Sequence, residues 1–349
     1  MKVSKDIFNE IVSLENLVTA WEEFRINKGK KIDVQEFEFL LEQNLFSLHR
    51  DLIARRYTHA PYKGFYVRDP KVRHIHKASV RDRVLHHALF RILNPIFEKT
   101  FIAHSFSCRV GKGTHKGVLA VEAMIRKESR NYTRQCFVLK CDVRKFFDSI
   151  DHTILIAILK KRIVDPDTMW LLEQVIQSFS AQQETLFSHQ GIPIGNLTSQ
   201  LFANVYMNEF DQFVKHEMKI KYYARYTDDF VVVSSNKTYL DGLIDPFTKF
   251  LEETLKLSLH PNKISIRSAG QGIDFLGYIT LPHYRLVRTN TKHRIFRKLK
   301  SRVVQYRQGE IDKETLTQCL QSYLGVLSHA NAHNLSNDLV NQYWFLLNE

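Results

Sequence analysis

The sequence predicts an α+β fold, in which short antiparallel strands lie beside helices. Three patterns support this prediction. Apolar residues recur at helical spacing in SVRDRVLHHALFRILNPIF, residues 79–97, which is typical of a helix with one buried face. Apolar and polar residues alternate in FVLKCDV, residues 137–143, as they do in a half-buried strand. YYARYTDDFVVVS, residues 222–234, predicts two strands joined by a tight turn.

The boundaries of these elements carry their own signals. Ser79, three residues before Asp82, is expected to cap the first helix, and Pro95 is expected to end it. The loop GIPIGN is broken by glycine and proline, and a helix is predicted after it over residues 198–218. A helix, a Pro-Asn break and a strand are expected over 250–266, a strand or hairpin over 274–281, and mostly helices from residue 290 onward.

The composition indicates a folded protein with a polyanionic partner. The chain has 349 residues, 44% of them hydrophobic, which is enough for about two or three domains with a sizeable core. Fifty Lys and Arg residues against 37 Asp and Glu residues give a formal charge of +13, and such a surplus favours nucleic acid as a partner. Alternatively, the charge indicates only a soluble basic protein without such a partner.

Other classes are disfavoured by what the sequence lacks. No apolar run is long enough to span a bilayer, and the first residues do not resemble a signal peptide. We therefore expect a protein without a membrane association, located in the cytoplasm. The four cysteines form no CxxC pair, so we expect four reduced thiols and no structural zinc.

Three aspartates are the candidate catalytic residues. Asp228 and Asp229 lie at the predicted hairpin turn, where the usual interpretation of an acid pair is a solvated turn. Asp142 lies near the end of the strand 137–143, on the face opposite Phe137, Leu139 and Cys141, and we expect it to be exposed to a cleft. If these strands are neighbours, the three carboxylates converge. That arrangement suits two Mg²⁺ ions about 3.5–4 Å apart, because Mg²⁺ prefers hard oxygen ligands.

Five ordered motifs carry a resemblance to a known family: KCDVRKFFDSID, GIPIGNLTSQLFANVYMNEFD, ARYTDDFVVVS, HPNKI and DFLGY. Their order and spacing resemble the palm motifs of reverse transcriptases. VRDRVLHHAL and HSFSCRVGKGTHKG precede them as fingers-like segments, and SYLGVLSHANAHNL follows as a thumb-like segment. The resemblance covers roughly residues 50 to 335.

The resemblance implies a right-hand polymerase: fingers, a palm with a mostly antiparallel sheet and helices on one face, and a helical thumb. The expected boundaries are an N-terminal helical segment over 1–49, fingers over 50–135, a palm over 136–284 with inserted finger helices near 153–185, and a thumb over 285–349. Basic residues cluster over 50–91 and 285–307, on either side of the carboxylate motifs.

The loop GIPIGNLTSQ indicates the type of reverse transcriptase. The group II intron type usually has Pro-Gln-Gly followed by Ser-Pro, whereas here Ile194 replaces the Gln and Ser199-Gln200 replaces Ser-Pro. This version looks like the reverse transcriptases of diversity-generating retroelements, within the group II intron-like superfamily. That family copies a template-repeat RNA into cDNA with mutations directed to adenines. An intron-derived, CRISPR-associated or phage-defence reverse transcriptase is the first alternative, and a non-catalytic RNA-binding scaffold is the second.

The resemblance also implies roles for particular residues. Asp142 and Asp228 are the principal ligands of two Mg²⁺ ions, for which Mn²⁺ is a substitute, with Asp229 in support and the Val143 carbonyl as an extra ligand. Phe147 faces the incoming sugar, with Phe146 as the alternative. The remaining expected nucleotide-binding residues are Ile194, Gly195, Gln200, Arg73, Arg81 and Lys263. The expected nucleic-acid-binding residues are Tyr226, Gly277, Lys292, Arg294, Arg297 and Lys298.

Lys263, in HPNKI, could protonate the departing pyrophosphate or simply position a phosphate. The expected partners are an RNA template, a cDNA primer strand and deoxynucleoside triphosphates. A small basic accessory protein is expected as well, and the host would be a bacterium, an archaeon or a phage-infected cell.

Overall fold

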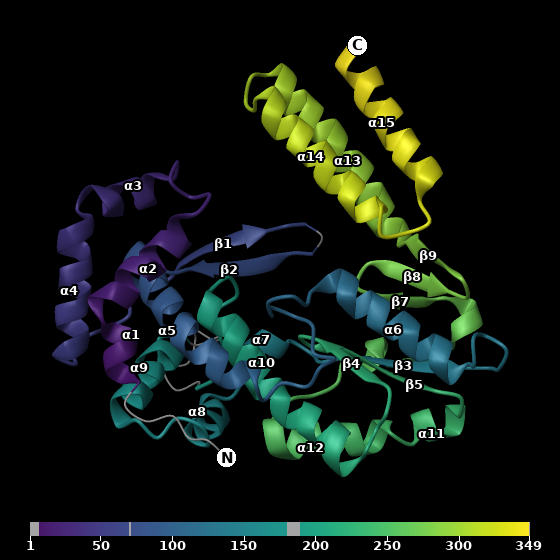
Figure 1. The fold of residues 1–349 in the computed structure, drawn as a ribbon, viewed down its shortest axis with the longest axis horizontal. Helices are drawn as coiled ribbons and strands as arrows, with labels where there is room; N and C mark the ends of the chain where they lie inside the picture. Colours follow the sequence, from purple (N-terminus) through teal and green to yellow (C-terminus); the bar gives the residue numbers. More distant parts are fainter. Residues whose placement is uncertain (1–6, 70, 180–188, 349) are drawn as a thin grey trace.

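The computed structural model describes residues 7–69, 71–179 and 189–348, and it confirms the α+β class. Figure 1 shows a helical region at one side, a sheet with helices around it at the other, and three long helices above. Among the described residues, none of the helices combines the length and the hydrophobicity needed to cross a membrane. All four cysteines are free thiols, and two of them, Cys136 and Cys141, are buried.

The N-terminal helices share one core with the helix predicted over 79–97. These are α1 (Phe8–Val12), α2 (Leu14–Arg25), α3 (Ile32–Phe39) and α4 (Leu41–Ile53), which pack around α5 (Val80–Glu98). Ser79 caps α5 as predicted, because its hydroxyl accepts from the Asp82 backbone N–H at 3.2 Å. The predicted end at Pro95 is wrong, since α5 continues to Glu98. Burial of Leu93 and Phe97 on either side of the proline offsets the one backbone hydrogen bond that proline removes.

A hairpin that the sequence patterns did not indicate follows these helices. It consists of β1 (Lys63–Val67) and β2 (Arg73–Lys77), paired in antiparallel register. All of β1 is exposed, and Phe65, Tyr66 and Val67 present apolar surface to solvent. Figure 1 shows the hairpin extending from the helical region toward the three long helices.

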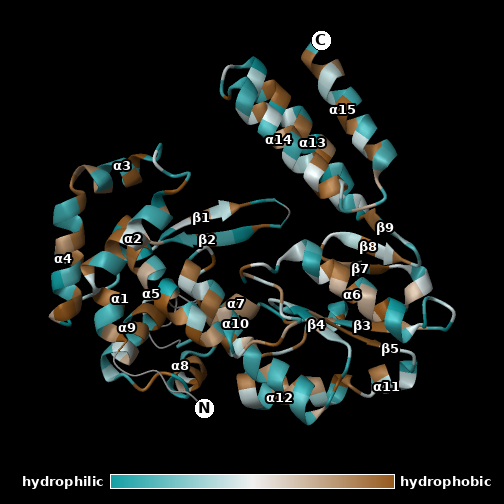
Figure 2. Cartoon of the chain, viewed as in Figure 1, coloured by the Kyte–Doolittle hydropathy of each residue, from teal (hydrophilic) through white to brown (hydrophobic). Residues whose placement is uncertain are grey.

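The central sheet has four antiparallel strands in the order β4-β5-β3-β6. Its strands are β3 (Phe137–Asp142), β4 (Tyr223–Tyr226), β5 (Asp229–Ser234) and β6 (Ser265–Ser268). Strand β3 contributes Leu139 and Cys141 to one apolar core and Val138 to another, and Figure 2 shows brown, apolar segments where the sheet meets its helices. The predicted strands 137–143 and 222–234 are therefore confirmed as neighbours.

Helices cover the sheet on both faces, whereas the sequence predicted one. The first face, with Leu139 and Phe230, packs on α10 (Leu197–Gln212) and α12 (Ile244–Leu255), and α11 (Lys237–Asp241) lies beside it. The second face, with Val138 and Val231, packs on α6 (Thr114–Glu128). Because α6 covers only part of that face, the ends of β3 and β5 extend beyond it.

Shorter elements connect these parts. They are α7 (Phe146–Ser149), α8 (His152–Lys160), α9 (Pro166–Gln177), the π-helical turn η1 (Phe213–Glu217) and the 3₁₀ turns η2 (Pro261–Lys263) and η3 (Ala269–Gln271). Helices α8 and α9 coincide with the insertion expected near 153–185, of which residues 180–188 lie outside the described residues.

The C-terminal region has a core of its own. A three-stranded sheet, β7 (Ile273–Phe275), β8 (Tyr278–Leu281) and β9 (Tyr284–Val287), leads into α13 (Thr289–Arg307), α14 (Lys313–Leu327) and α15 (His333–Asn348). Helix α13 also contacts the tip of the β1–β2 hairpin, where Asp69 pairs with Lys298 and lies 3.6 Å from Arg297. The hairpin, the central sheet and these helices therefore surround one region of the surface.

Candidate active site

The three candidate acids lie where β3 ends and where the β4–β5 hairpin turns. Asp142 is paired directly with Asp229 in the register of β3 and β5, and the Val143 N–H donates to the Asp228 carbonyl at 3.2 Å. Thr227, the first residue of the turn, has a φ of +56°, which is unusual for a β-branched residue. The predicted convergence of the strands is therefore present.

Asp142 differs from its prediction in exposure. It points to the face opposite Leu139 and Cys141 as expected, but the residue is only 8% exposed. The Lys263 ammonium covers it, with Nζ 2.5 Å from Asp142 Oδ1. The expectation of an exposed carboxylate is wrong, because a cation from η2 shields it from solvent. Asp142 still lines a pocket together with Asp229.

The acids influence one another electrostatically. The pKa of Asp228 is raised to about 6, mainly by burial and then by the neighbouring Asp229 and Asp142 carboxylates, against a smaller opposing effect of Lys263. Burial also raises the pKa of Asp229; Lys140 opposes this increase and Asp142 adds to it. A group of three carboxylates, of which Asp142 is buried and Asp228 and Asp229 are partly buried, favours a bound cation, because the cation removes their mutual repulsion.

The donor set suits a hard divalent cation, although the side chains are not gathered around one point. Nowhere in residues 7–69, 71–179 and 189–348 are three or more His, Cys, Asp or Glu side chains placed to hold a metal ion. At Asp142, the Lys263 ammonium occupies the position that a metal ion would need. Carboxylate oxygens are the ligands that Mg²⁺ prefers, and Asp142 and Asp229 lie on one pocket wall.

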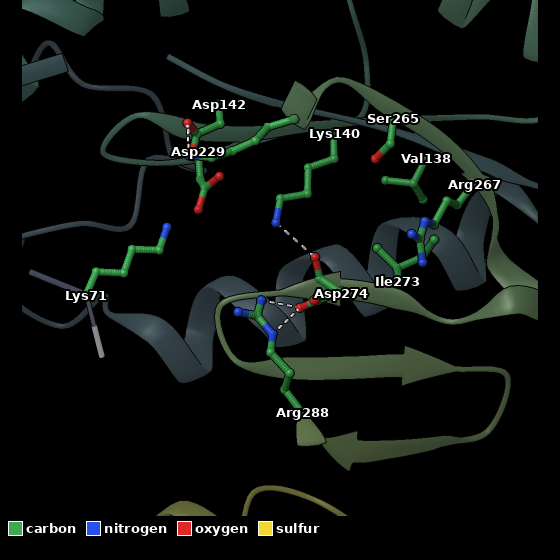
Figure 3. Close-up of a pocket in the computed structure, with 11 residues that line it drawn as sticks. Lys71, Val138, Lys140, Asp142, Asp229, Ser265, Arg267, Ile273, Asp274 and Arg288 are labelled. Atoms are coloured by element: carbon green, nitrogen blue, oxygen red, sulfur yellow. Dashed lines mark hydrogen bonds and ion pairs between the residues drawn. The ribbon is translucent and has the colours of Figure 1, made fainter. Parts of the chain in front are cut away.

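Four basic residues that the sequence analysis did not single out for the site also line this pocket, of about 320 Å³. Figure 3 shows Lys71, Lys140, Arg267 and Arg288 around the pocket, with the carboxylates of Asp142 and Asp229 at one side. Lys140 was detectable, because it lies two residues before Asp142 and so shares its face of the strand. The pocket therefore combines three carboxylates, of which Asp274 is paired with Arg288, with several further cations, as a site for a metal-bound phosphate would.

The two arginines expected to bind the triphosphate lie elsewhere. Arg81 forms an ion pair with Asp51 at 2.9 Å and stacks over the Tyr57 ring. Arg73 is exposed at the start of β2. The structure therefore does not bring either arginine to the pocket of the acids; Lys71, from the same segment, lines it instead.

Phe147 and the 191–200 loop lie beside each other. Phe146 is buried in the core, whereas Phe147 is only partly buried. The Phe147 carbonyl accepts from the Ile192 N–H at 2.8 Å, and the Ile194 carbonyl accepts from the His76 N–H at 3.3 Å. Strand β2 therefore docks on the turn that contains Ile194.

Gly195 and Gln200 line a second pocket, between α2, α5, the β1–β2 hairpin and the start of α10. Gly195 has a φ of +114°, and a Cβ added there would lie 3.1 Å from Ile75 Cγ2. Both residues were expected to bind the nucleotide together with the acids. The structure instead places them in a separate pocket.

The expected nucleic-acid contacts occupy two regions. Tyr226 is the register partner of Asp229, and Gly277 forms the β7–β8 turn with a φ of +90°. A backbone requirement for positive φ therefore accounts for Gly277. The four remaining expected residues, Lys292, Arg294, Arg297 and Lys298, lie on α13, where Lys292, Arg297 and Lys298 are exposed.

Comparison with known proteins agrees with this geometry. A family model described as reverse transcriptase (RNA-dependent DNA polymerase) matches residues 67–280. The chain belongs to the reverse transcriptase family. This reverse transcriptase is therefore an RNA-directed DNA polymerase, with RNA, DNA and deoxynucleoside triphosphates as its class of substrates. The matched region contains all three acids, Lys140 and Lys263, and it ends before the thumb-like helices begin.

Two curated relatives are similar to the reverse transcriptase over most of its length. Protein YkfC of Escherichia coli (strain K12) is 26% identical over 70% of this chain and 72% of its own. The group II intron-encoded protein LtrA of Lactococcus lactis subsp. cremoris is 21% identical over 74% of this chain, which spans only 54% of LtrA. Among solved structures, apo telomerase from Candida tropicalis truncated from the C-terminal domain covers 70% of this chain and 60% of its own, at 12% identity and a TM-score of 0.48.

Proposed function

We propose that the reverse transcriptase adds deoxynucleotides to a primer 3′-end with Asp142, Asp228 and Asp229 as ligands of two Mg²⁺ ions. The observation that carries this proposal is the direct pairing of Asp142 with Asp229 on one pocket wall beside Asp228. Such ions, when bound, activate the primer hydroxyl and stabilise the leaving pyrophosphate. The Val143 carbonyl would supply a further oxygen ligand, and Mn²⁺ is expected to substitute for Mg²⁺.

The cationic residues of the pocket have complementary roles in this proposal. Lys263 must release Asp142 before that carboxylate can bind a metal ion, which leaves its ammonium free to protonate pyrophosphate or to hold a phosphate. Lys71 and Lys140 lie around the same pocket and would balance the charge of a triphosphate. Both act as point charges, which suits a group that moves during the reaction.

The domain boundaries follow from the same proposal. We assign residues 50–135 to the fingers, 136–284 to the palm with inserted helices near 153–185, and 285–349 to the thumb, after an N-terminal segment over 1–49. The separate core of α13, α14 and α15 supports the last boundary. The boundary near residue 50 does not separate two cores, because α1 to α4 share a core with α5.

Phe147 is proposed to select deoxynucleotides. Its ring is partly exposed beside the 191–200 loop, whereas the alternative residue, Phe146, is fully packed. A ring at this position leaves no space for a 2′-hydroxyl. Phe147→Ala is expected to incorporate ribonucleotides at least tenfold more often than the native enzyme, measured by alkali-sensitive cleavage of the cDNA. An unchanged sugar preference would show that another group excludes ribonucleotides.

The diversity-generating retroelement type is the finer proposal. Ile194 carries no side-chain hydrogen-bonding group in a loop where the intron type has Gln, which supports loose base selection opposite template adenine. Ile194→Gln is expected to lower misincorporation opposite adenine by several-fold, measured by sequencing cDNA copied from a defined RNA. Error rates opposite C, G and U in the same reads are the internal control. Equal adenine error rates in both enzymes would refute this role of Ile194.

An intron-type reverse transcriptase is the second candidate, and the likeness to LtrA favours it. One experiment separates the two candidates and also tests the site. The purified enzyme copies a defined RNA with Mg²⁺, with and without any co-encoded small basic protein, and the cDNA is sequenced. Errors concentrated at adenines support the retroelement type, whereas uniform fidelity supports the intron type. Asp228→Asn should abolish synthesis, and Asp241→Asn, an exposed acid on α11, should not.

The setting of this activity is proposed from its substrates. RNA and deoxynucleoside triphosphates are available in the cytoplasm, so we place the enzyme in the cytoplasm of a bacterium, an archaeon or a phage-infected cell. A small basic accessory protein is proposed to help the structured RNA prime synthesis. If the enzyme copies its natural RNA template without any accessory protein, the proposed role of that protein in priming is wrong.

A further inference from the structure

A fully buried ion pair lies directly behind the hairpin that carries Asp228 and Asp229. Arg225, on β4, and Asp211, on α10, are both 0% exposed. Arg225 Nε donates to Asp211 Oδ1 at 2.8 Å, and a terminal nitrogen donates to Oδ2 at 2.6 Å. The Tyr223 hydroxyl donates to the same carboxylate at 2.7 Å. Burying such a pair gains little net stability, so its presence calls for another explanation.

The guanidinium reaches the catalytic turn itself. Its second terminal nitrogen donates to the Thr227 carbonyl at 3.0 Å and approaches Asn204 Oδ1 at 3.5 Å. The nitrogen that binds Asp211 Oδ2 also donates to the Ser105 hydroxyl at 3.1 Å. All five N–H groups of the arginine therefore have an acceptor. Lysine, with three donors on one atom, could not replace this geometry.

The turn depends on this support because its backbone is strained. Thr227 is β-branched and has a φ of +56°, so it persists only if its surroundings hold it. Besides the Arg225 contact, the Thr227 hydroxyl donates to the Ser107 hydroxyl at 2.6 Å. Asn204 fixes that partner by donating to the Ser107 carbonyl at 2.9 Å. Strand β4 and the loop before α6 thus contact the turn residue directly, and α10 supports both contacts through Asp211 and Asn204.

We propose that Arg225, held by Asp211, is the positioning residue of the catalytic hairpin: through the Thr227 carbonyl it fixes where Asp228 and Asp229 lie against Asp142. Arg225 itself is fully buried and touches neither acid through a hydrogen bond. This role rests on the proposed function of Asp228 and Asp229 as the catalytic acids.

The test compares Arg225→Lys with a matched variant that loses a buried contact without touching the hairpin. Tyr206→Phe suits this purpose, because the buried Tyr206 hydroxyl, also on α10, donates to the Leu255 carbonyl at 2.6 Å. Both variants are expected to melt at lower temperature than the native chain. Only Arg225→Lys should lower kcat at least 100-fold, with KM for nucleotide and Kd for primer–template within threefold of native values.

A second measurement uses the metal-free protein. Amide hydrogen exchange over residues 222–234 should speed up at least tenfold in Arg225→Lys, and peptides from α12 should be unchanged. In Tyr206→Phe, the hairpin should exchange as in the native chain. If Arg225→Lys keeps kcat within threefold, or if its hairpin exchanges at the native rate, the positioning role is wrong.

Two further variants test the proposal even if Arg225→Lys does not fold. Ser107→Ala removes the acceptor of the Thr227 hydroxyl, together with a contact to Cys108 Sγ at 3.4 Å, and a fall in kcat of threefold to tenfold with unchanged primer–template Kd is expected. Native kcat in Ser107→Ala would contradict the proposal if Arg225→Lys does not fold. Asp228→Asn distinguishes a failure of the proposed catalytic acids from a failure of the positioning role of Arg225. If Asp228→Asn remains active, the assignment of the catalytic acids is wrong, irrespective of Arg225.

Discussion

At the scale of single residues, Asp228 shows the conflict between stability and function in this site. Its pKa is raised to about 6 by burial and by the neighbouring carboxylates. In the metal-free chain the ionised side chain therefore destabilises the fold. An uncharged side chain of the same shape removes that cost and with it the proposed capacity to bind a cation.

Asp228→Asn is therefore expected to stabilise the metal-free protein at pH 7–8. The folded-state pKa lies above the 3.8 of the unfolded chain, so the native carboxyl costs nothing below about pH 4 and most above pH 6. We expect a gain in the free energy of unfolding of about 1–2 kcal/mol at pH 7.5 and none near pH 4. Urea unfolding at both pH values measures it. An equal effect at both would mean that charge is not the cause.

Residue patterns predicted the positions of the three acids in the strands and the turn better than they predicted the contacts around these acids. The period of two in β3 was enough to put Asp142 on the face opposite Leu139 and Cys141, and the turn residues put Asp228 and Asp229 at the hairpin tip. The exposure of Asp142 was not predictable, because Lys263 lies on a different element more than a hundred positions away and covers it. Contacts of this kind depend on the fold as a whole.

At the scale of elements, the β1–β2 hairpin was not predicted by the strand patterns. Its residues are exposed or partly buried and include basic and histidine side chains, so no alternation between a buried and a solvated face marks it. Backbone pairing holds it instead, together with two hydrogen bonds to the 191–200 loop, from the His76 N–H to Ile194 and from Asn196 to the His76 carbonyl. Ion pairs of Lys77 with Asp33 and of Asp69 with Lys298 add to these contacts. A periodic pattern of apolar residues arises where one face of an element is buried, and this hairpin buries little surface.

Gly195→Ala should loosen this hairpin. A Cβ at a φ of +114° is strained and would lie 3.1 Å from Ile75 Cγ2, so a loss in the free energy of unfolding of about 1–3 kcal/mol is expected. Hydrogen exchange in β2 should speed up, and KM for nucleotide should rise. Gly325→Ala, in α14 with open space around it, is the control and should be neutral or stabilising. Native exchange in β2 would contradict this docking role.

At the scale of the whole molecule, the positive charge should govern nucleic-acid binding. The formal charge is +13, and α13 carries several cations on its surface. The sequence indicated both features but could not indicate the order β4-β5-β3-β6, which sets β3 between strands from distant parts of the chain. That order depends on long-range packing, which no local pattern records.

The double substitution Arg294→Gln and Arg297→Gln should reduce the salt dependence of primer–template binding. Each lost phosphate contact removes roughly 0.7–0.9 from the slope of log K against log salt concentration, so a decrease of about 1–2 is expected. Fluorescence anisotropy at several salt concentrations measures it. Lys237→Gln with Lys249→Gln, exposed on α11 and α12, removes the same charge elsewhere. Equal decreases in both would mean that only net charge matters.

The contact between Asp69 and α13 has a consequence for how a substrate arrives. Lys71, between β1 and β2, the central sheet and Arg288, which precedes α13, line the pocket of the acids, and ion pairs of Asp69 with Lys298 and Arg297 join the hairpin to α13. A long RNA that reaches the pocket between the hairpin and α13 must either enter from a free end or wait for this junction to open. Salt weakens the junction as well as the grip on phosphate, so moderate salt should speed loading onto an end-blocked template while it shortens each binding event.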